Sequence, residues 1–176
     1  MKTPERYIGA KWEDVPAAIR ASVEMMQATG KGIYIHGAVG TGKTHIAYAI
    51  KHHIEAQPGG WLLFWNVTDL LHEVRADFNR DGNDKRQPDQ ALVDQSIGGT
   101  KYLAILDDIG AEKPSEFVSE TLYLIINGRY NKMLPTIFTS NCDLGQLAER
   151  IGERNASRIA EMCEIVNLTG ADRRLT

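Results

Sequence analysis

Residues 37–44 read Gly-Ala-Val-Gly-Thr-Gly-Lys-Thr, which are the residue types and spacing of a phosphate-binding loop. The glycines allow a tight turn, so that successive N–H groups point inward at phosphate oxygens. Lys43 offers a positive charge to the β- and γ-phosphates, and the hydroxyl of Thr44 is placed to ligate Mg²⁺. An apolar run precedes the loop and a helical pattern begins near His45, so a helix dipole would face the same phosphates. We therefore predict a nucleotide site formed by Gly37, Ala38, Val39, Gly40, Thr41, Gly42, Lys43, Thr44 and His45.

Two adjacent acids, Asp107 and Asp108, follow a second apolar run at 102–106. In a parallel sheet, both carboxylates would lie at the carboxyl edge, where the phosphate-binding loop also lies. Asp107 is the candidate to share Mg²⁺ with Thr44, as a Walker B acid does. Asp108 is the candidate to orient or deprotonate the water that attacks the γ-phosphate. Two solvated acids at a strand end are the alternative, which the phosphate-binding loop makes less favourable.

A polar amide, Asn141, ends a third apolar run that begins at Thr136. From a strand next to the acidic one, it could hydrogen-bond the attacking water or the γ-phosphate. Its alternative role is to cap the helix that follows, but Asp143 is the better candidate for that cap. We therefore favour a role for Asn141 in the site.

Two arginines, Arg154 and Arg158, are four residues apart and would share one face of a helix. A guanidinium is planar and always charged, which suits a phosphate bound to a neighbouring subunit, as an arginine finger. The alternative is a solvated pair that forms salt bridges with Glu153 or Glu161. These residues by themselves favour that alternative.

The elements that must position these residues alternate between apolar runs and amphipathic stretches, which predicts an α/β fold with a parallel sheet covered on both faces. Strands are expected at 33–36, 62–66, 102–106, 136–139 and 164–168, and helices at 15–28, 43–55, 68–78, 114–132 and 144–150. The polar stretch 79–89 is expected to be a loop.

Composition limits the alternatives. The chain of 176 residues is 43% hydrophobic and has a formal net charge of −3, which fits one domain without a general basic field for nucleic acid. Its two cysteines have no metal-binding spacing, and there is no signal-peptide core or membrane-length apolar run, so we expect a cytoplasmic protein without a membrane partner. Local candidates for contact with single-stranded DNA are Arg75, Arg80, Lys85 and Arg86, with a solvated face as the alternative.

The order of these motifs resembles the AAA+ ATPases of the bacterial helicase-loader type, DnaC and DnaI, and their close relatives, the transposition helpers of the IstB type. The matching residues are 37–44, 105–113, 127–130, 135–141 and 153–159, within a region that spans nearly the whole chain. The resemblance implies ATP and Mg²⁺ as cofactors and a three-layer fold with strand order 5-1-4-3-2. It also implies that Asn141 is the sensor I residue and Arg158 the arginine finger, with Arg154 as runner-up.

The resemblance further implies that the segment around Trp12 lies over the adenine, which makes Val15 and Trp12 candidate base contacts. Packing of Trp12 against the following helix is the alternative. Compared with the family, residues 1–176 are expected to form a single ATPase core, with the amino-terminal partner-binding extension and the carboxyl-terminal lid absent or minimal. Arg173 is a weak substitute for the arginine of that lid.

Three functions are compatible with these residues. We favour an ATP-hydrolysing switch that self-associates through an arginine-finger interface and helps load or remodel a replication protein such as the replicative helicase. An IstB-like transposition helper is the alternative within the family. A small-molecule P-loop kinase is less favoured because no lid for an acceptor follows, and a non-hydrolysing adaptor is less favoured because the catalytic residues look complete.

Overall fold

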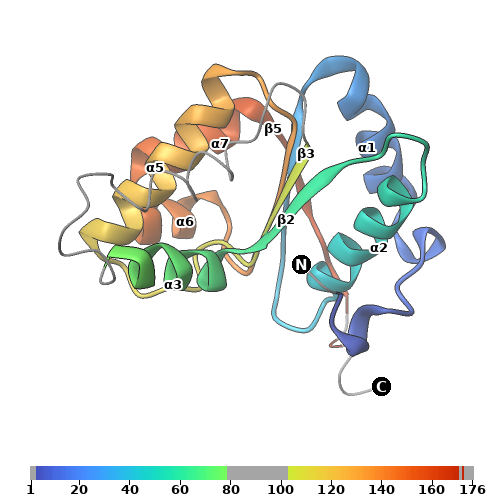
Figure 1. Cartoon of the computed structure of the whole chain (residues 1–176), viewed down its shortest axis with the longest axis horizontal. Coiled ribbons are helices and arrows are strands. Elements are labelled where there is room, and N and C mark those ends of the chain that lie inside the picture. Colours follow the sequence, from blue (N-terminus) through green and yellow to red (C-terminus); the bar gives the residue numbers. More distant parts are fainter. Residues whose placement is uncertain (1–2, 79–102, 171, 173–176) are drawn as a thin grey trace.

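A five-stranded parallel sheet lies between two layers of helices in the computed structural model, which describes residues 3–78, 103–170 and 172 (Figure 1). The strands are β1 (Gly32–His36), β2 (Leu62–Asn66), β3 (Leu103–Asp107), β4 (Thr136–Ser140) and β5 (Cys163–Asn167). All paired strands are parallel, and their order is β2-β3-β4-β1-β5. Read from the other edge this is 5-1-4-3-2, so the predicted α/β class and strand order are confirmed.

The helices divide between the two faces of the sheet (Figure 1). One layer holds α1 (Ala17–Thr29) and α2 (Lys43–Glu55), and short 3₁₀ turns at Glu5–Tyr7 and Trp12–Asp14 pack against α2. The other layer holds α3 (Val67–Phe78), α5 (Glu116–Asn131), α6 (Leu144–Ile151) and α7 (Glu153–Met162). The helices at 43–55, 68–78, 114–132 and 144–150 lie within a few residues of their predicted positions.

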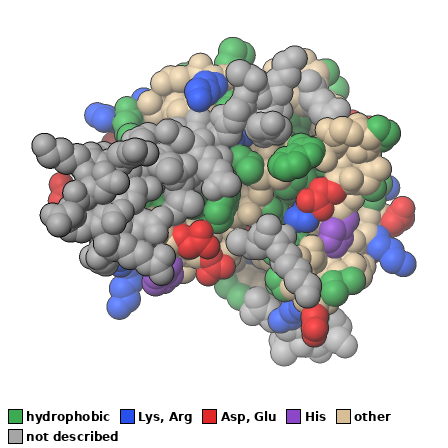
Figure 2. All heavy atoms as spheres, viewed as in Figure 1, with side chains coloured by type: hydrophobic (Ala, Val, Ile, Leu, Met, Phe, Trp, Pro, Cys, Tyr) green, Lys and Arg blue, Asp and Glu red, His purple; other side chains and the backbone are tan. Residues whose placement is uncertain are grey.

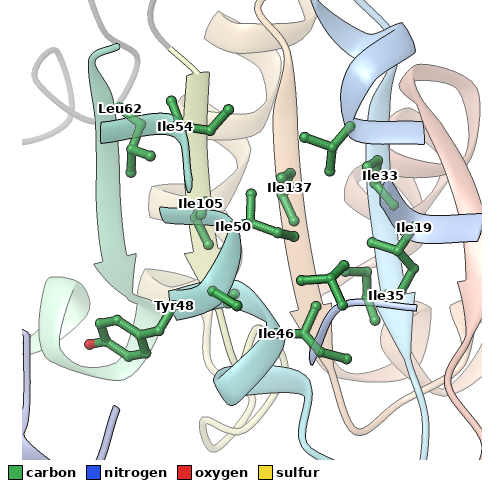
Figure 3. Packing of buried hydrophobic residues seen from close by; sticks show 14 of the residues in the cluster. Ile19, Ile33, Ile35, Ile46, Tyr48, Ile50, Ile54, Leu62, Ile105 and Ile137 are labelled. Atoms are coloured by element: carbon green, nitrogen blue, oxygen red, sulfur yellow. The ribbon is translucent and has the colours of Figure 1, made fainter. Parts of the chain in front are cut away.

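Two hydrophobic cores follow from the alternation of side chains along the buried strands. Ile33 and Ile35 of β1 face α1 and α2 in the first core, together with Ile105 and Ile137 (Figure 3). Tyr34, between the two isoleucines, belongs to the second core with α3, α5, α6 and α7. Because the central strands are buried on both faces, they read in the sequence as nearly continuous apolar runs.

Two helices begin two residues later than predicted, for local reasons. Helix α1 begins at Ala17 and not at Val15, because Pro16 disfavours helical geometry in the residue before it, and Val15 is extended with φ −78° and ψ 127°. Helix α5 begins at Glu116 because Ser115 is its N-cap and accepts the backbone N–H of Val118. The predicted loop at 79–89 and the first residue of the predicted strand at 102 lie outside the described residues.

The described surface seen in Figure 2 carries acidic and basic side chains interspersed, without a continuous basic area. Among the helices that the structure describes, none is both long enough and apolar enough to span a membrane.

Candidate active site

The phosphate-binding loop connects β1 to α2 and has the backbone that its glycines predict. Gly40 has φ +83° and Gly42, the N-cap of α2, has φ +95°, both in the left-handed region that residues with a side chain disfavour. Helix α2 begins at Lys43, so its first N–H groups face the end of the loop. Backbone donors and the positive end of the helix dipole therefore converge where a phosphate would bind.

Lys43 folds back over the loop. Its ammonium group donates to the carbonyl oxygens of Gly37 and Ala38, each at 2.8 Å, and the residue is only 6% exposed. The loop thus holds the positive charge close to its own N–H groups.

Thr44 and Asp107 meet across the edge of the sheet, where the Thr44 hydroxyl donates to Oδ2 of Asp107 at 3.2 Å. Asp107 is 2% exposed, and its Oδ1 accepts the hydroxyl of Thr139 at 2.6 Å. Burial raises the pKa of Asp107 to about 6, and the charge of Asp108 adds to this, while hydrogen bonds from Thr139 and Thr44 act in the opposite direction.

The donor set at this position suits Mg²⁺. A hydroxyl and a carboxylate are hard oxygen ligands, and Mg²⁺ is commonly bound by one or two protein groups together with substrate phosphates and water. In the part of the chain that the structure describes, no group of three or more His, Cys, Asp or Glu could hold a metal ion. Thr44 and Asp107 could therefore hold Mg²⁺ only when the phosphates of a bound nucleotide supply further oxygen ligands.

Asp108 and Asn141 form the second pair. The amide of Asn141 donates to Oδ1 of Asp108 at 3.0 Å, and both residues line the same cavity as the loop. Asp108 has φ +61°, an uncommon conformation for a residue other than glycine and one that concentrates at functional sites. Asn141 does not cap the next helix, because Asp143 is the N-cap of α6 and accepts the N–H of Gln146 at 2.9 Å.

A cavity of about 320 Å³ brings these parts together. It is lined by Arg6, Tyr7, Val39, Gly40, Gly42, Lys43, Thr44, His45, Asp108 and Asn141. Asp107 lies behind this lining, where Thr44 reaches it. The loop, one acid and the polar amide predicted from the sequence are therefore neighbours in space.

The amino-terminal segment contributes residues that the sequence did not reveal. Arg6 and Tyr7 line the cavity, and the ring of Tyr7 stacks on Tyr48 of α2 with centroids 4.7 Å apart. Val15 is instead 2% exposed within the first core and does not line the cavity. Trp12 is also absent from the lining and stacks on His53 of α2, with ring centroids 3.9 Å apart, so its observed stacking partner is on α2 and not on the helix that directly follows it.

His45 joins this segment to the loop. Its Nε2 lies 2.8 Å from a carboxylate oxygen of Asp14, in the short 3₁₀ turn Trp12–Asp14. Because no periodic pattern marks residues 5–14, the sequence carries no signal of which of their side chains reach the cavity.

Arg158 and Arg154 lie on α7, in the helical layer opposite α2, and neither lines the cavity. Arg158 donates from Nε to Oδ1 of Asn127 at 3.0 Å, and its guanidinium lies 4.9 Å from the ring centroid of Tyr123. The guanidinium of Arg154 also lies over the ring of Tyr123, 5.4 Å from its centroid. Within the described residues, neither arginine forms the alternative salt bridge with Glu153 or Glu161.

Of the candidate DNA contacts, Arg75 stacks on Phe117 with its guanidinium 4.7 Å from the ring centroid. Arg80, Lys85, Arg86 and Arg173 lie outside the residues that the structure describes. This stacking contact does not distinguish a DNA contact from a solvated face, so the role of Arg75 stays a prediction.

A glycine-rich loop between β1 and α2, an acid at the end of β3 and the order 5-1-4-3-2 define a P-loop NTPase of the AAA+ type. The chain belongs to the family of IstB-like ATP binding proteins, which matches residues 19–176.

Two curated relatives share this region. The replicative helicase loader DnaI of Bacillus subtilis is 27% identical over 153 residues, which cover 83% of this chain and 46% of DnaI. An ATP-binding protein in an insertion sequence of Mycobacterium tuberculosis is 32% identical over 113 residues, 64% of this chain and 41% of that protein. The chain thus spans about half the length of the curated relatives it matches.

The crystal structure of the DnaC helicase loader superposes with a TM-score of 0.77 at 26% identity, covering 94% of this chain and all of that chain. The predicted membership among relatives of DnaC, DnaI and IstB is therefore confirmed.

Proposed function

We propose that this chain binds ATP with Mg²⁺, hydrolyses it, and uses the nucleotide to control assembly with further copies of itself and action on a replicative helicase. The observation that carries the proposal is that two polar pairs, Thr44 with Asp107 and Asp108 with Asn141, come together at the edge of one cavity beside the phosphate-binding loop. This is the arrangement that hydrolysis of a nucleoside triphosphate requires.

Each residue has a distinct role in the proposed reaction. The loop N–H groups and Lys43 bind the phosphates, and Thr44 and Asp107 hold the metal site. When bound at Thr44 and Asp107, Mg²⁺ would supply positive charge that neutralises the phosphates. Asp108 orients a water molecule towards the γ-phosphate and accepts its proton, and Asn141 fixes the carboxylate of Asp108 and can bond the γ-phosphate.

The chain would complete this site by self-association. Arg158 and Arg154 lie on α7, on the opposite face of the sheet from α2 (Figure 1), and neither lines the cavity of their own chain. We therefore assign Arg158 as the arginine finger that one copy inserts into the nucleotide site of another, with Arg154 as the alternative. Stacking on Tyr123 and the bond to Asn127 would hold Arg158 ready for this role.

The partner assignment rests on relatives. The names of DnaI and DnaC describe loaders of the replicative helicase, and we extend that partner to this chain. Single-stranded DNA stays a prediction from the sequence, because these names do not mention it. The insertion-sequence relative supports the alternative, a transposition helper. Adding a replicative helicase and, separately, a transposase to the purified protein distinguishes them, because only the true partner should change its ATP turnover.

Turnover against protein concentration tests the hydrolytic part of the proposal. If the finger acts between copies, the rate per chain should rise with concentration and be low for the dilute monomer. Phosphate release that never exceeds the background of Lys43→Ala, at any concentration and with DNA and helicase added, would overturn it.

A further inference from the structure

Thr139, near the end of β4, lies between the two acids of the proposed site. It is 1% exposed, and its hydroxyl donates to Oδ1 of Asp107 at 2.6 Å. The same hydroxyl oxygen accepts the backbone N–H of Asp108 at 2.9 Å. One buried oxygen atom is therefore bonded to both acidic residues.

The backbone of Thr139 adds a third contact to the same turn. Its carbonyl oxygen accepts the N–H of Ile109 at 2.9 Å. Thr139 thus accepts hydrogen bonds from two successive backbone N–H groups, those of Asp108 and Ile109. These bonds hold Asp108 at φ +61°, a conformation that a residue with a side chain keeps only when its surroundings impose it.

The hydroxyl also determines how Asp107 presents its carboxylate. A threonine hydroxyl has one proton, and here that proton goes to Oδ1 of Asp107 while the N–H of Asp108 occupies an acceptor position. Oδ2 of Asp107 is left to face Thr44, at 3.2 Å. The oxygen available to a metal ion is thereby selected by the strand next to the one that carries the acid.

We propose that Thr139 is a positioning residue of the active site, which aims Oδ2 of Asp107 at the magnesium position and holds Asp108 where its carboxylate reaches Asn141. This inference rests on the proposed ATP hydrolysis, in which Asp107 and Asp108 have those roles. Groups that bond a metal-ligating carboxylate from behind commonly change metal affinity or activity about 10- to 100-fold when removed.

The competing explanation is that Thr139 contributes only to stability, as a buried hydroxyl with satisfied hydrogen bonds. A second threonine on β4 provides a matched control. Thr136 is also fully buried, and its hydroxyl accepts from Nε of Arg129 at 2.7 Å and donates to the carbonyl of Leu134 at 2.9 Å. It lies at the other end of the strand, away from the acids, so its loss perturbs folding without touching the site.

The experiment compares Thr139→Val, Thr139→Ser and Thr136→Val in the whole protein. ATP turnover is measured with increasing Mg²⁺, and binding of a fluorescent ATP analogue is measured with Mg²⁺ and in EDTA. Hydrogen exchange of the peptide that contains Asp108 and Ile109 is followed without nucleotide. Thr139→Ala is compared with Thr139→Ser as well, because these two differ only in the hydroxyl and serve if Thr139→Val does not fold.

Loss of the hydroxyl should lower kcat and raise the Mg²⁺ concentration for half-maximal turnover, each by about 10- to 100-fold. Binding in EDTA should change by less than about twofold because the loop is intact, and the Asp108 amide should exchange faster without nucleotide. Thr139→Ser should restore most of the activity. Thr136→Val should lower thermal stability while keeping kcat within about threefold of the wild type.

Equal losses of activity in Thr136→Val and Thr139→Val, or unchanged Mg²⁺ dependence in the variants that lack the hydroxyl, would overturn the positioning role. Failure of the proposed function looks different, because then the wild type itself releases no phosphate. In that case the Mg²⁺ dependence of analogue binding decides about Thr139, with the same outcomes for and against.

Discussion

The hydroxyl of Thr44 lies 3.2 Å from Oδ2 of Asp107, although the two residues are 63 positions apart in the chain. Thr44 belongs to the first turn of α2, and Asp107 ends β3, which is separated from β1 by β4 in the sheet. Their contact joins the phosphate-binding loop to the acidic strand. Asp108 follows Asp107 directly in the chain and accepts the amide of Asn141, so this contact also leads to the second polar pair.

Asp107→Asn should stabilise the nucleotide-free protein at pH 8. Burial raises the folded pKa of Asp107 to about 6, from an ordinary value of 3.8, so ionisation of this carboxylate opposes folding. The penalty is complete above the folded pKa and is relieved as the pH falls through about 6 towards 4. The gain in unfolding free energy is at most roughly 3 kcal/mol at pH 8, and should shrink by pH 5.

Thermal unfolding of both proteins between pH 5 and pH 8, without nucleotide, measures this difference. Stabilisation by Mg²⁺ with ATP should be lost in the variant, because a metal-ligating oxygen is replaced. A variant less stable than the wild type at pH 8, or a gain that does not change with pH, would contradict the predicted cost of the buried charge.

Asp108→Asn should lower kcat by about 10²-fold or more, the usual contribution of a general base, while binding of ATP with Mg²⁺ stays within a few-fold of the wild type. The amide keeps the size of the side chain and can still accept the bond from Asn141, but it cannot take a proton. Single-turnover phosphate release and analogue binding measure the two effects. Glu116→Gln, on α5 and outside the cavity, is the control and should change neither quantity.

Arg158→Ala should bind ATP normally but lose about 10³-fold or more of its turnover at high protein concentration, as expected for an arginine finger. Mixing it with Lys43→Ala is the sharpest measurement. Lys43→Ala lacks a working nucleotide site but keeps Arg158, and Arg158→Ala keeps the site, so mixed assemblies should recover activity that neither variant has alone.

Arg20→Ala, on α1, serves as the arginine control and should behave as the wild type. If Arg158→Ala keeps the turnover of the wild type, while Arg154→Ala loses turnover and recovers it on mixing with Lys43→Ala, the finger is Arg154. A fully active, dilute Arg158→Ala monomer would remove the proposed interface altogether.

Tyr7→Ala should weaken ATP binding by about 2- to 10-fold, the range expected for the loss of one aromatic contact. The ring lines the cavity and is held by stacking on Tyr48, so it can contact a base directly. Tyr7→Phe keeps the ring and should bind ATP as the wild type does. Trp12→Ala is the control, because Trp12 stacks on His53 outside the cavity lining; an equal loss of affinity in that variant would point to disturbance of the whole segment.

The fold class could be predicted from the sequence, and so could the proposed site residues that have local signatures. Residues 37–44 are contiguous, so their glycines and the apolar run before them are enough to predict the backbone geometry of the loop. Asp107, Asp108 and Asn141 each end an apolar run, and parallel strands place such ends at one edge. The strand order came from the resemblance and is confirmed by the observed sheet.

Other relationships depend on register and packing between distant segments, which no local pattern encodes. That Thr139 bonds both acids follows from the alignment of β4 beside β3, in which Leu106 lies opposite Phe138. That Tyr7 and not Val15 reaches the cavity follows from how an irregular segment packs on α2.

The sequence by itself thus determined the phosphate-binding loop and the polar residues that end the neighbouring strands, because those signals are short and local. Only the tertiary structure decided which residues contact those groups, because hydrogen bonds across a sheet and stacking across helices form between segments that folding alone brings together.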